Sequence, residues 1–97
     1  MDRNLVLEQI YAALDVVNSQ LPPSRRLSRT PDTVLVGIGG ALDSLGIVNF
    51  VLALEEKLGD AIGRPVALLD PEILGAEQGP FRTVATVADH VVALTAS

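Results

Sequence analysis

The fold is decided by residues 42–59, which read LDSLGIVNFVLALEEKLG. Apolar residues recur along this stretch at the spacing that places them on one face of an α-helix. The residues on the predicted core face are Ile47, Phe50, Val51, Leu54 and Leu58. Asp43 or Ser44 suits the N-cap position, and Gly59 suits the C-terminal stop. The sequence therefore predicts an amphipathic helix that begins near Asp43 and ends near Gly59.

A second helix is predicted from Asn4 to about Asn18, with Asp2 or Asn4 as a candidate cap. Its core-face residues are Val6, Ile10, Ala13, Leu14 and Val17. The prolines at 22 and 23 prevent it from continuing. Residues 22–33 (PPSRRLSRTPDT) are expected to form a polar loop. Residues 34–36 (VLV) fit either a short strand or an apolar loop packed over the core.

The last helix is predicted to open at Thr83. Its expected core-face residues are Val84, Val87, Ala88, Val91 and Leu94. A short helix is predicted from Asp70 to about Leu74. Three long helices and one short helix predict an all-α fold, a small four-helix bundle formed by one domain that spans 1–97.

Composition narrows the class of protein. The chain has 97 residues, of which 48% are apolar and only 3% are aromatic, so the core must be aliphatic. There is no Cys, which excludes disulfides, thiolate metal sites and a cysteine nucleophile. Any thiol chemistry would have to be supplied by a cofactor.

The net charge of -5 argues against nucleic acid as a partner, because most of the surface would repel a phosphate backbone. The positive charge is concentrated in the loop that carries Arg25, Arg26 and Arg29. No signal peptide and no apolar run of about 20 residues is seen, so no membrane insertion is expected. We expect a soluble, cytoplasmic domain.

Several catalytic or ligand-binding motifs are rejected. The GIGG stretch at 37–40 lacks the further glycine of a dinucleotide fingerprint, because Leu42 stands there, and no lysine makes it a phosphate loop. Ser44 with His90 and Asp89 is not a triad, because Asp89 neighbours His90 on one helix and points elsewhere. Glu56 and Asp60 are better explained as a solvated acidic face than as a metal site.

One candidate functional motif is not rejected: a serine at the start of an amphipathic helix. Ser44 follows Asp43, precedes Leu45 and has glycines just upstream. A helix N-terminus offers amides without partners and a partial positive charge, and both favour a phosphate attached there. From the residues alone, the simpler interpretation is that Asp43 or Ser44 is only an N-cap.

Residues 42–59 resemble the second helix of the acyl carrier protein family. The Asp-Ser-Leu motif at 43–45 and the Ala-Leu-Glu-Glu stretch at 53–56 carry the likeness. The order of the other segments fits as well: a long first helix, a long loop, a short third helix and a final helix near Thr83. The resemblance covers essentially the whole chain.

This resemblance implies a carrier rather than an enzyme. A phosphopantetheinyl transferase would esterify Ser44 with 4'-phosphopantetheine taken from coenzyme A, and the thiol of that arm would hold acyl groups as thioesters. Asp43 would flank the modified serine, and Leu45 would help the transferase and partner enzymes to grip it. The partners would be acyl-loading and acyl-transfer enzymes. The resemblance places Leu45, Val48, Asn49, Leu52 and Glu56 on the partner-facing side.

The chain departs from the family where typical fatty-acid carriers are acidic, since Gly46, Ile47 and Asn49 stand in those places. Charge complementarity sets encounter rates and partner choice. We therefore expect a freestanding, monomeric carrier that serves a dedicated lipid or secondary-metabolite pathway. An aminoacyl or peptidyl carrier stays open as an alternative, although Asp43 favours the acyl type. A helical interaction module that is never modified also stays open.

Overall fold

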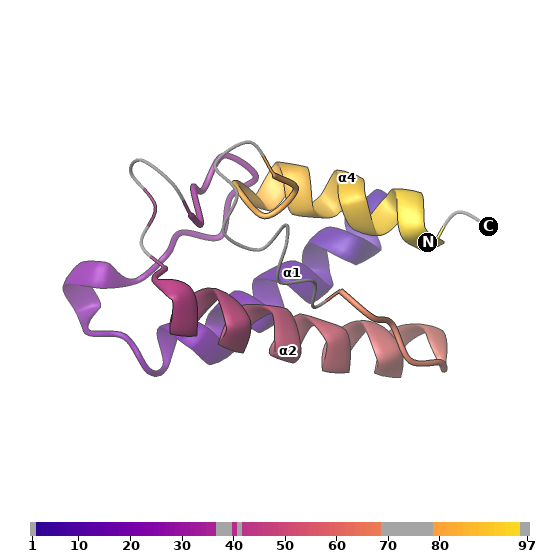
Figure 1. Cartoon of the computed structure of the whole chain (residues 1–97), viewed down its shortest axis with the longest axis horizontal. Coiled ribbons are helices and arrows are strands. Elements are labelled where there is room, and N and C mark those ends of the chain that lie inside the picture. The colour runs from indigo at the N-terminus through magenta and orange to yellow at the C-terminus, as the bar shows by residue number, and fades with distance from the viewer. Residues whose placement is uncertain (1, 37–39, 41, 69–78, 96–97) are drawn as a thin grey trace.

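The computed structural model describes residues 2–36, 40, 42–68 and 79–95 (Figure 1). Its elements are α1 (Arg3–Asn18), the 3-10 helix η1 (Pro23–Arg25), α2 (Ser44–Ile62) and α4 (Val84–Thr95). Within these ranges there are three α-helices and no strand, which confirms the predicted all-α class. The short helix predicted from Asp70 to Leu74 lies outside the described residues.

α1 is the central element, because it packs against both α2 and α4. Figure 1 shows α1 passing behind the two other helices, with α2 along one side and α4 along the other. The radius of gyration is 12.2 Å, close to the value expected of a compact chain of this length. This arrangement puts one helical face of each element into a shared interior.

The interior is aliphatic, as the composition predicts, apart from the fully buried Phe50 and Phe81. All five residues predicted for the core face of α1 are buried, and so are all five predicted for α2. In α4, Val84, Val87, Ala88 and Val91 are buried, which confirms most of the predicted stripe. Leu94 is the exception, since it is 46% exposed on the last turn. It lines a pocket together with the residues that follow α2, rather than packing in the core.

The predicted end of α2 is wrong by one turn. The helix runs through Gly59 to Ile62, and Gly63 takes the left-handed conformation at φ 74°. The Gly63 amide donates to the Gly59 carbonyl at 2.9 Å and closes the final turn. A glycine inside a helix costs only about 1 kcal/mol, so Gly59 does not stop it. Gly63 is the residue that ends the helix, because it alone of the two glycines has the left-handed conformation.

The first residue of α1 is close to the predicted one, but the predicted cap does not form a capping hydrogen bond. The helix begins at Arg3, one residue before the predicted Asn4, and Asp2 occupies the N-cap. However, the Asp2 side chain makes no capping hydrogen bond.

The residues at 34–36 form an apolar loop rather than a strand: Val34 makes one isolated bridge with Thr83, and Leu35 and Val36 are buried.

Candidate functional site

The start of α2 is the candidate site, and it is held by Asp43. Asp43 is the N-cap residue in an extended conformation, and Ser44 is the first residue of the helix. The Asp43 carboxylate accepts a hydrogen bond from the Gly46 amide at 2.7 Å. Its backbone carbonyl accepts from the Ile47 amide at 2.9 Å. Of the two caps proposed from the sequence, Asp43 is therefore the one that closes the first turn.

Gly46 allows this cap to form at close range. A methyl group on Gly46 would lie 3.2 Å from the Asp43 Oδ1 and 3.2 Å from the Leu42 side chain. A glycine at this position leaves room for both neighbours. Any larger residue at 46 would have to displace the Asp43 carboxylate or the Leu42 side chain by a few tenths of an ångström.

The residues that precede Asp43 are anchored to the core. Leu42 is buried, and its amide donates to the Leu35 carbonyl at 3.0 Å. Gly40 approaches the same segment so closely that a Cβ there would lie 2.7 Å from the Val36 backbone. Backbone packing this tight fixes where α2 begins.

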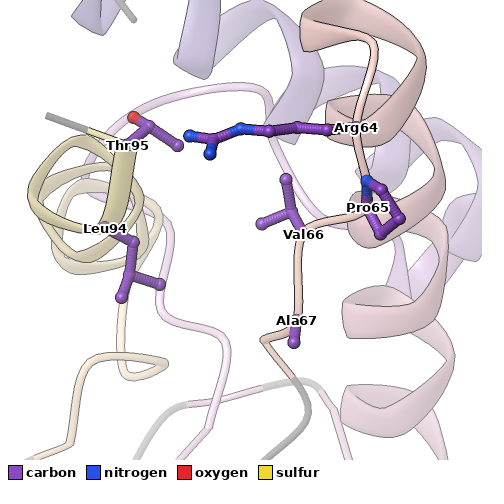
Figure 2. Close-up of a pocket in the computed structure, with 6 residues that line it drawn as sticks. All are labelled: Arg64, Pro65, Val66, Ala67, Leu94 and Thr95. Atoms are coloured by element: carbon purple, nitrogen blue, oxygen red, sulfur yellow. The ribbon is translucent and has the colours of Figure 1, made fainter. Parts of the chain in front are cut away.

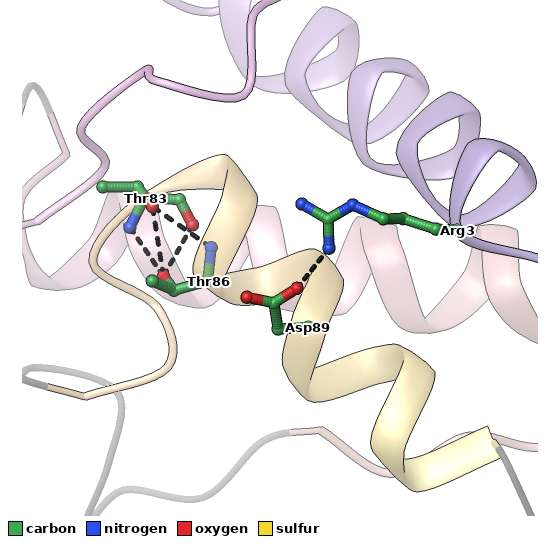
Figure 3. Close-up of polar contacts among 4 residues, drawn as sticks. All are labelled: Arg3, Thr83, Thr86 and Asp89. Carbon is green, nitrogen blue, oxygen red and sulfur yellow. Dashed lines mark hydrogen bonds and ion pairs between the residues drawn. The ribbon is translucent and has the colours of Figure 1, made fainter.

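The segment at 31–36 is in turn fastened to the entry of α4. The Leu35 amide donates to the Arg82 carbonyl at 2.7 Å, and the Val84 amide donates to the Thr33 carbonyl at 3.0 Å. α4 itself opens on a reciprocal cap, in which the Thr86 amide donates to the Thr83 hydroxyl and the Thr83 amide donates to the Thr86 hydroxyl (Figure 3). Ser44 therefore follows a loop that is tied to a distant part of the sequence.

The face of α2 opposite the core has a mixed character. Leu45 is 69% exposed and Leu52 is 48% exposed, which is high for large apolar side chains. Glu56 is exposed, while Val48 and Asn49 are half-buried. Val48 also packs against the edge of the core. Ile47 is buried, so an acidic residue there would face the interior rather than a partner.

Glu55 has a structural role that the sequence pattern did not reveal. Its carboxylate accepts a hydrogen bond from the Leu68 amide at 2.6 Å, which fastens the segment after α2 back onto the helix. The neighbouring Glu56 stays exposed. Of the two glutamates of the Ala-Leu-Glu-Glu stretch, Glu55 thus stabilises the fold and Glu56 is exposed. Only Glu56 lies on the predicted partner-facing side. Helical periodicity alone gives no signal for the Leu68 contact.

Two arginines of the basic loop fold onto α1. Arg26 Nε donates to the carbonyls of Asn18 and Leu21, at 3.2 and 3.3 Å, where α1 ends. Arg29 pairs with Asp15 at 3.6 Å and lies 5.5 Å from the centre of the Tyr11 ring. Arg26 thus lies at the C-terminal end of α1, where a cation is favoured, whereas Arg29 contacts side chains of α1.

Two further titratable side chains, Asp89 and His90, have structural contacts in the part of the chain that the structure describes. Asp89 pairs with Arg3 across α4 and α1, as Figure 3 shows. His90 is half-buried, with its ring edge-to-face against Phe81 at 5.8 Å between centroids. Across the described ranges, no three His, Cys, Asp or Glu residues gather where they would hold a metal ion. In those ranges, too, no helix is both long and apolar enough to span a membrane.

A pocket of about 190 Å³ lies at the other end of α2 (Figure 2). It is lined by Arg64, Pro65, Val66, Ala67, Leu94 and Thr95. The 19 residues of α2 span about 28 Å, so this pocket is remote from Ser44. It is therefore separate from the candidate site.

Comparison with protein-family models, with curated proteins and with solved structures gives no match to this chain.

Proposed function

We propose that this chain is an acyl carrier protein with a four-helix fold. A 4'-phosphopantetheine arm on Ser44, transferred from coenzyme A, would hold acyl groups as thioesters on its terminal thiol. The chain would be a cytoplasmic monomer without enzymatic activity of its own. It would deliver its cargo to the acyl-loading and acyl-transfer enzymes of a dedicated lipid or secondary-metabolite pathway.

The observation that carries this proposal is the position of Ser44 as the first residue of a long, capped helix. First-turn amides have no acceptor inside their own helix, and the helix dipole adds partial positive charge at this end. Both effects favour a phosphodiester on a side chain located there. The Asp43 carboxylate, which would oppose it electrostatically, is engaged by the Gly46 amide at 2.7 Å.

The surrounding residues have distinct roles under this proposal. Asp43 and Leu45 flank the attachment point, and the exposed Leu45 offers an apolar contact to an enzyme that reaches Ser44. Val48, Asn49, Leu52 and Glu56 continue the same side of the helix. The opposite side anchors α2 in the core, so an approaching enzyme meets a rigid start of the helix.

The test is intact mass spectrometry after incubation with coenzyme A and a broad-specificity phosphopantetheinyl transferase. We expect one phosphopantetheinyl increment on the unmodified chain and none on Ser44→Ala. Ser19→Ala is the matched control, because Ser19 also lies at a helix end, and this variant should gain the increment normally.

A wild-type chain that gains no increment, with a transferase shown to be active on another carrier, would sink the proposal. The chain would then be better described as a helical interaction module that is never modified. If the increment is present, incubation with acyl-loading and with aminoacyl-loading enzymes separates an acyl carrier from an aminoacyl or peptidyl carrier.

A further inference from the structure

The pocket at the far end of α2 lies between the segment 64–67 and the last turn of α4 (Figure 2). The segment 64–67 is fixed to α2 at both of its ends. Before it, the Gly63 amide donates to the Gly59 carbonyl at 2.9 Å. After it, the Leu68 amide donates to the Glu55 carboxylate at 2.6 Å. This wall of the pocket is therefore held in position by the fold itself.

The opposite wall is the last turn of α4, which is held by Thr95. The Thr95 hydroxyl donates to the carbonyl of Val91 at 2.9 Å, and Val91 is fully buried in the core. Leu94 on the same turn is 46% exposed and lines the pocket. Figure 2 shows Leu94 and Val66 on opposite sides of the pocket, with the Arg64 side chain extending across it towards Thr95. The two walls are thus apolar, and a cation lies at one edge.

Arg64 determines the charge of the pocket, because none of the six lining residues is acidic. Arg64 is exposed, and among the described residues its side chain has no hydrogen-bond or ion-pair partner. Its guanidinium presents five N–H donors in a planar fork that matches the two oxygens of a carboxylate. The Thr95 hydroxyl has already donated its hydrogen to Val91, so it offers no competing donor. The polar edge of the pocket therefore favours an anionic acceptor.

The volume of the pocket limits the size of its ligand. It measures about 190 Å³, below the range of about 300–1,000 Å³ that is usual for drug-sized molecules. An apolar cavity of about 150 Å³ accommodates one benzene molecule. The apolar part of a ligand that fits between Val66 and Leu94 is therefore a single ring or an alkyl segment of similar size.

We propose that this pocket binds a small organic carboxylate, with the carboxylate on Arg64 and a compact apolar tail between Val66 and Leu94. Binding needs both parts, because neither an exposed charge pair nor the burial of one small apolar group is strong by itself. The pocket lies about 28 Å along α2 from Ser44. The inference therefore does not rest on the proposed carrier function.

Benzoate is the probe, since it joins a carboxylate to one apolar ring. Titration of the full chain, followed by two-dimensional amide NMR spectra, should give saturable shifts at residues 64, 66, 67, 94 and 95. We expect a Kd on the order of 1 mM for so small a ligand. Benzamide has the same shape without the charge, and acetate has the charge without the ring. Each should bind at least about fivefold more weakly than benzoate.

Variants separate the two parts of the pocket. Arg64→Gln should raise the Kd for benzoate at least about fivefold, because it removes the charge. Arg82→Gln is the matched control: Arg82 is also exposed but precedes α4, about 18 Å from the end of that helix, so its Kd should stay within about twofold. Leu94→Ala should raise the Kd about threefold, whereas Leu52→Ala, which truncates a leucine 48% exposed on α2, should leave it unchanged.

The absence of saturable shifts up to about 20 mM benzoate, far above the expected Kd, would overturn the proposal. Saturable shifts confined to amides outside the pocket would do the same. So would benzamide that binds as tightly as benzoate, or an Arg64→Gln variant that matches Arg82→Gln. The comparison of benzoate with benzamide uses the wild-type chain, so it holds even if a variant fails to fold. All titrations use the chain without a modification on Ser44, so their outcome is independent of the mass increment that tests the carrier function.

Discussion

The carboxylate of Asp43 lies 2.7 Å from the backbone amide of Gly46 and closes the first turn of α2. This contact is the only side-chain cap found at the N-cap positions of α1 and α2, because Asp2 occupies the corresponding position of α1 without making one. Asp2 and Asp43 are both N-cap residues, but only Asp43 accepts a hydrogen bond from the first turn of its helix.

This difference gives a matched pair of variants. Asp43→Ala should lower the free energy of unfolding by about 1 kcal/mol, because it removes a capping acceptor. Asp2→Ala should change it by less than about 0.5 kcal/mol, as expected of a surface residue without such a bond. Urea unfolding of both variants measures the two values. Equal losses would show that the Asp43 contact does not stabilise the helix.

Gly40 is predicted to be intolerant of a side chain. A Cβ at this position would lie 2.7 Å from the backbone of Val36 and 2.8 Å from the Leu35 carbonyl oxygen, so backbone must move to admit it. We expect Gly40→Ala to lower the free energy of unfolding by about 1–3 kcal/mol, the usual cost of overpacking. Hydrogen exchange at the Leu42 amide, which donates to Leu35, should become faster. Unchanged stability with unchanged exchange at Leu42 would contradict this account.

The adjacent glutamates of α2 should behave differently on truncation. Glu55→Ala removes the acceptor for the Leu68 amide, and a hydrogen bond to a charged group contributes about 1.5–3 kcal/mol. Glu56→Ala truncates an exposed side chain and should cost less than about 0.5 kcal/mol. Chemical unfolding measures the stabilities, and hydrogen exchange at Leu68 reports the local contact. A Leu68 amide that exchanges equally fast in both variants would refute the assignment.

Two glycines near the end of α2 should respond in opposite directions. Gly59 lies inside the helix, where a Cβ would make only an ordinary contact at 3.5 Å, so Gly59→Ala should stabilise the protein by up to about 1 kcal/mol. Gly63 has φ 74°, so Gly63→Ala should destabilise it by about 1 kcal/mol through backbone strain. Thermal unfolding of the pair gives the sign of each effect. A stabilising Gly63→Ala would show that the helix ends elsewhere.

The helices themselves follow from the sequence, because a helix is decided by local spacing. The stripe that runs from Ile47 to Leu58 predicted both the existence of α2 and the face that it buries, and the same reasoning located α1 and α4. The start of α2 at Asp43 and Ser44 was also predictable from capping chemistry. The error at its end arose because Gly59 and Gly63 are both plausible stops, and only the backbone conformation distinguishes them.

Other features depend on contacts between residues distant in sequence, and periodicity carries no information about those. The segment at 34–36 makes only one isolated bridge, from Val34 to Thr83, and buries Leu35 and Val36, so it is a loop over the core rather than a strand. Leu94 is 46% exposed and lines a pocket with residues 64–67, which helical spacing does not predict. The separate roles of Glu55 and Glu56 depend on the chain that returns to α2 at Leu68. The sequence by itself determined that α1, α2 and α4 form, which faces of α1 and α2 are buried and which serine starts α2, because these depend on neighbours within a few turns. The tertiary structure decided which side chains stabilise the fold and which stay exposed. Burial and hydrogen bonding depend on the residues, distant in sequence, that pack next to each side chain.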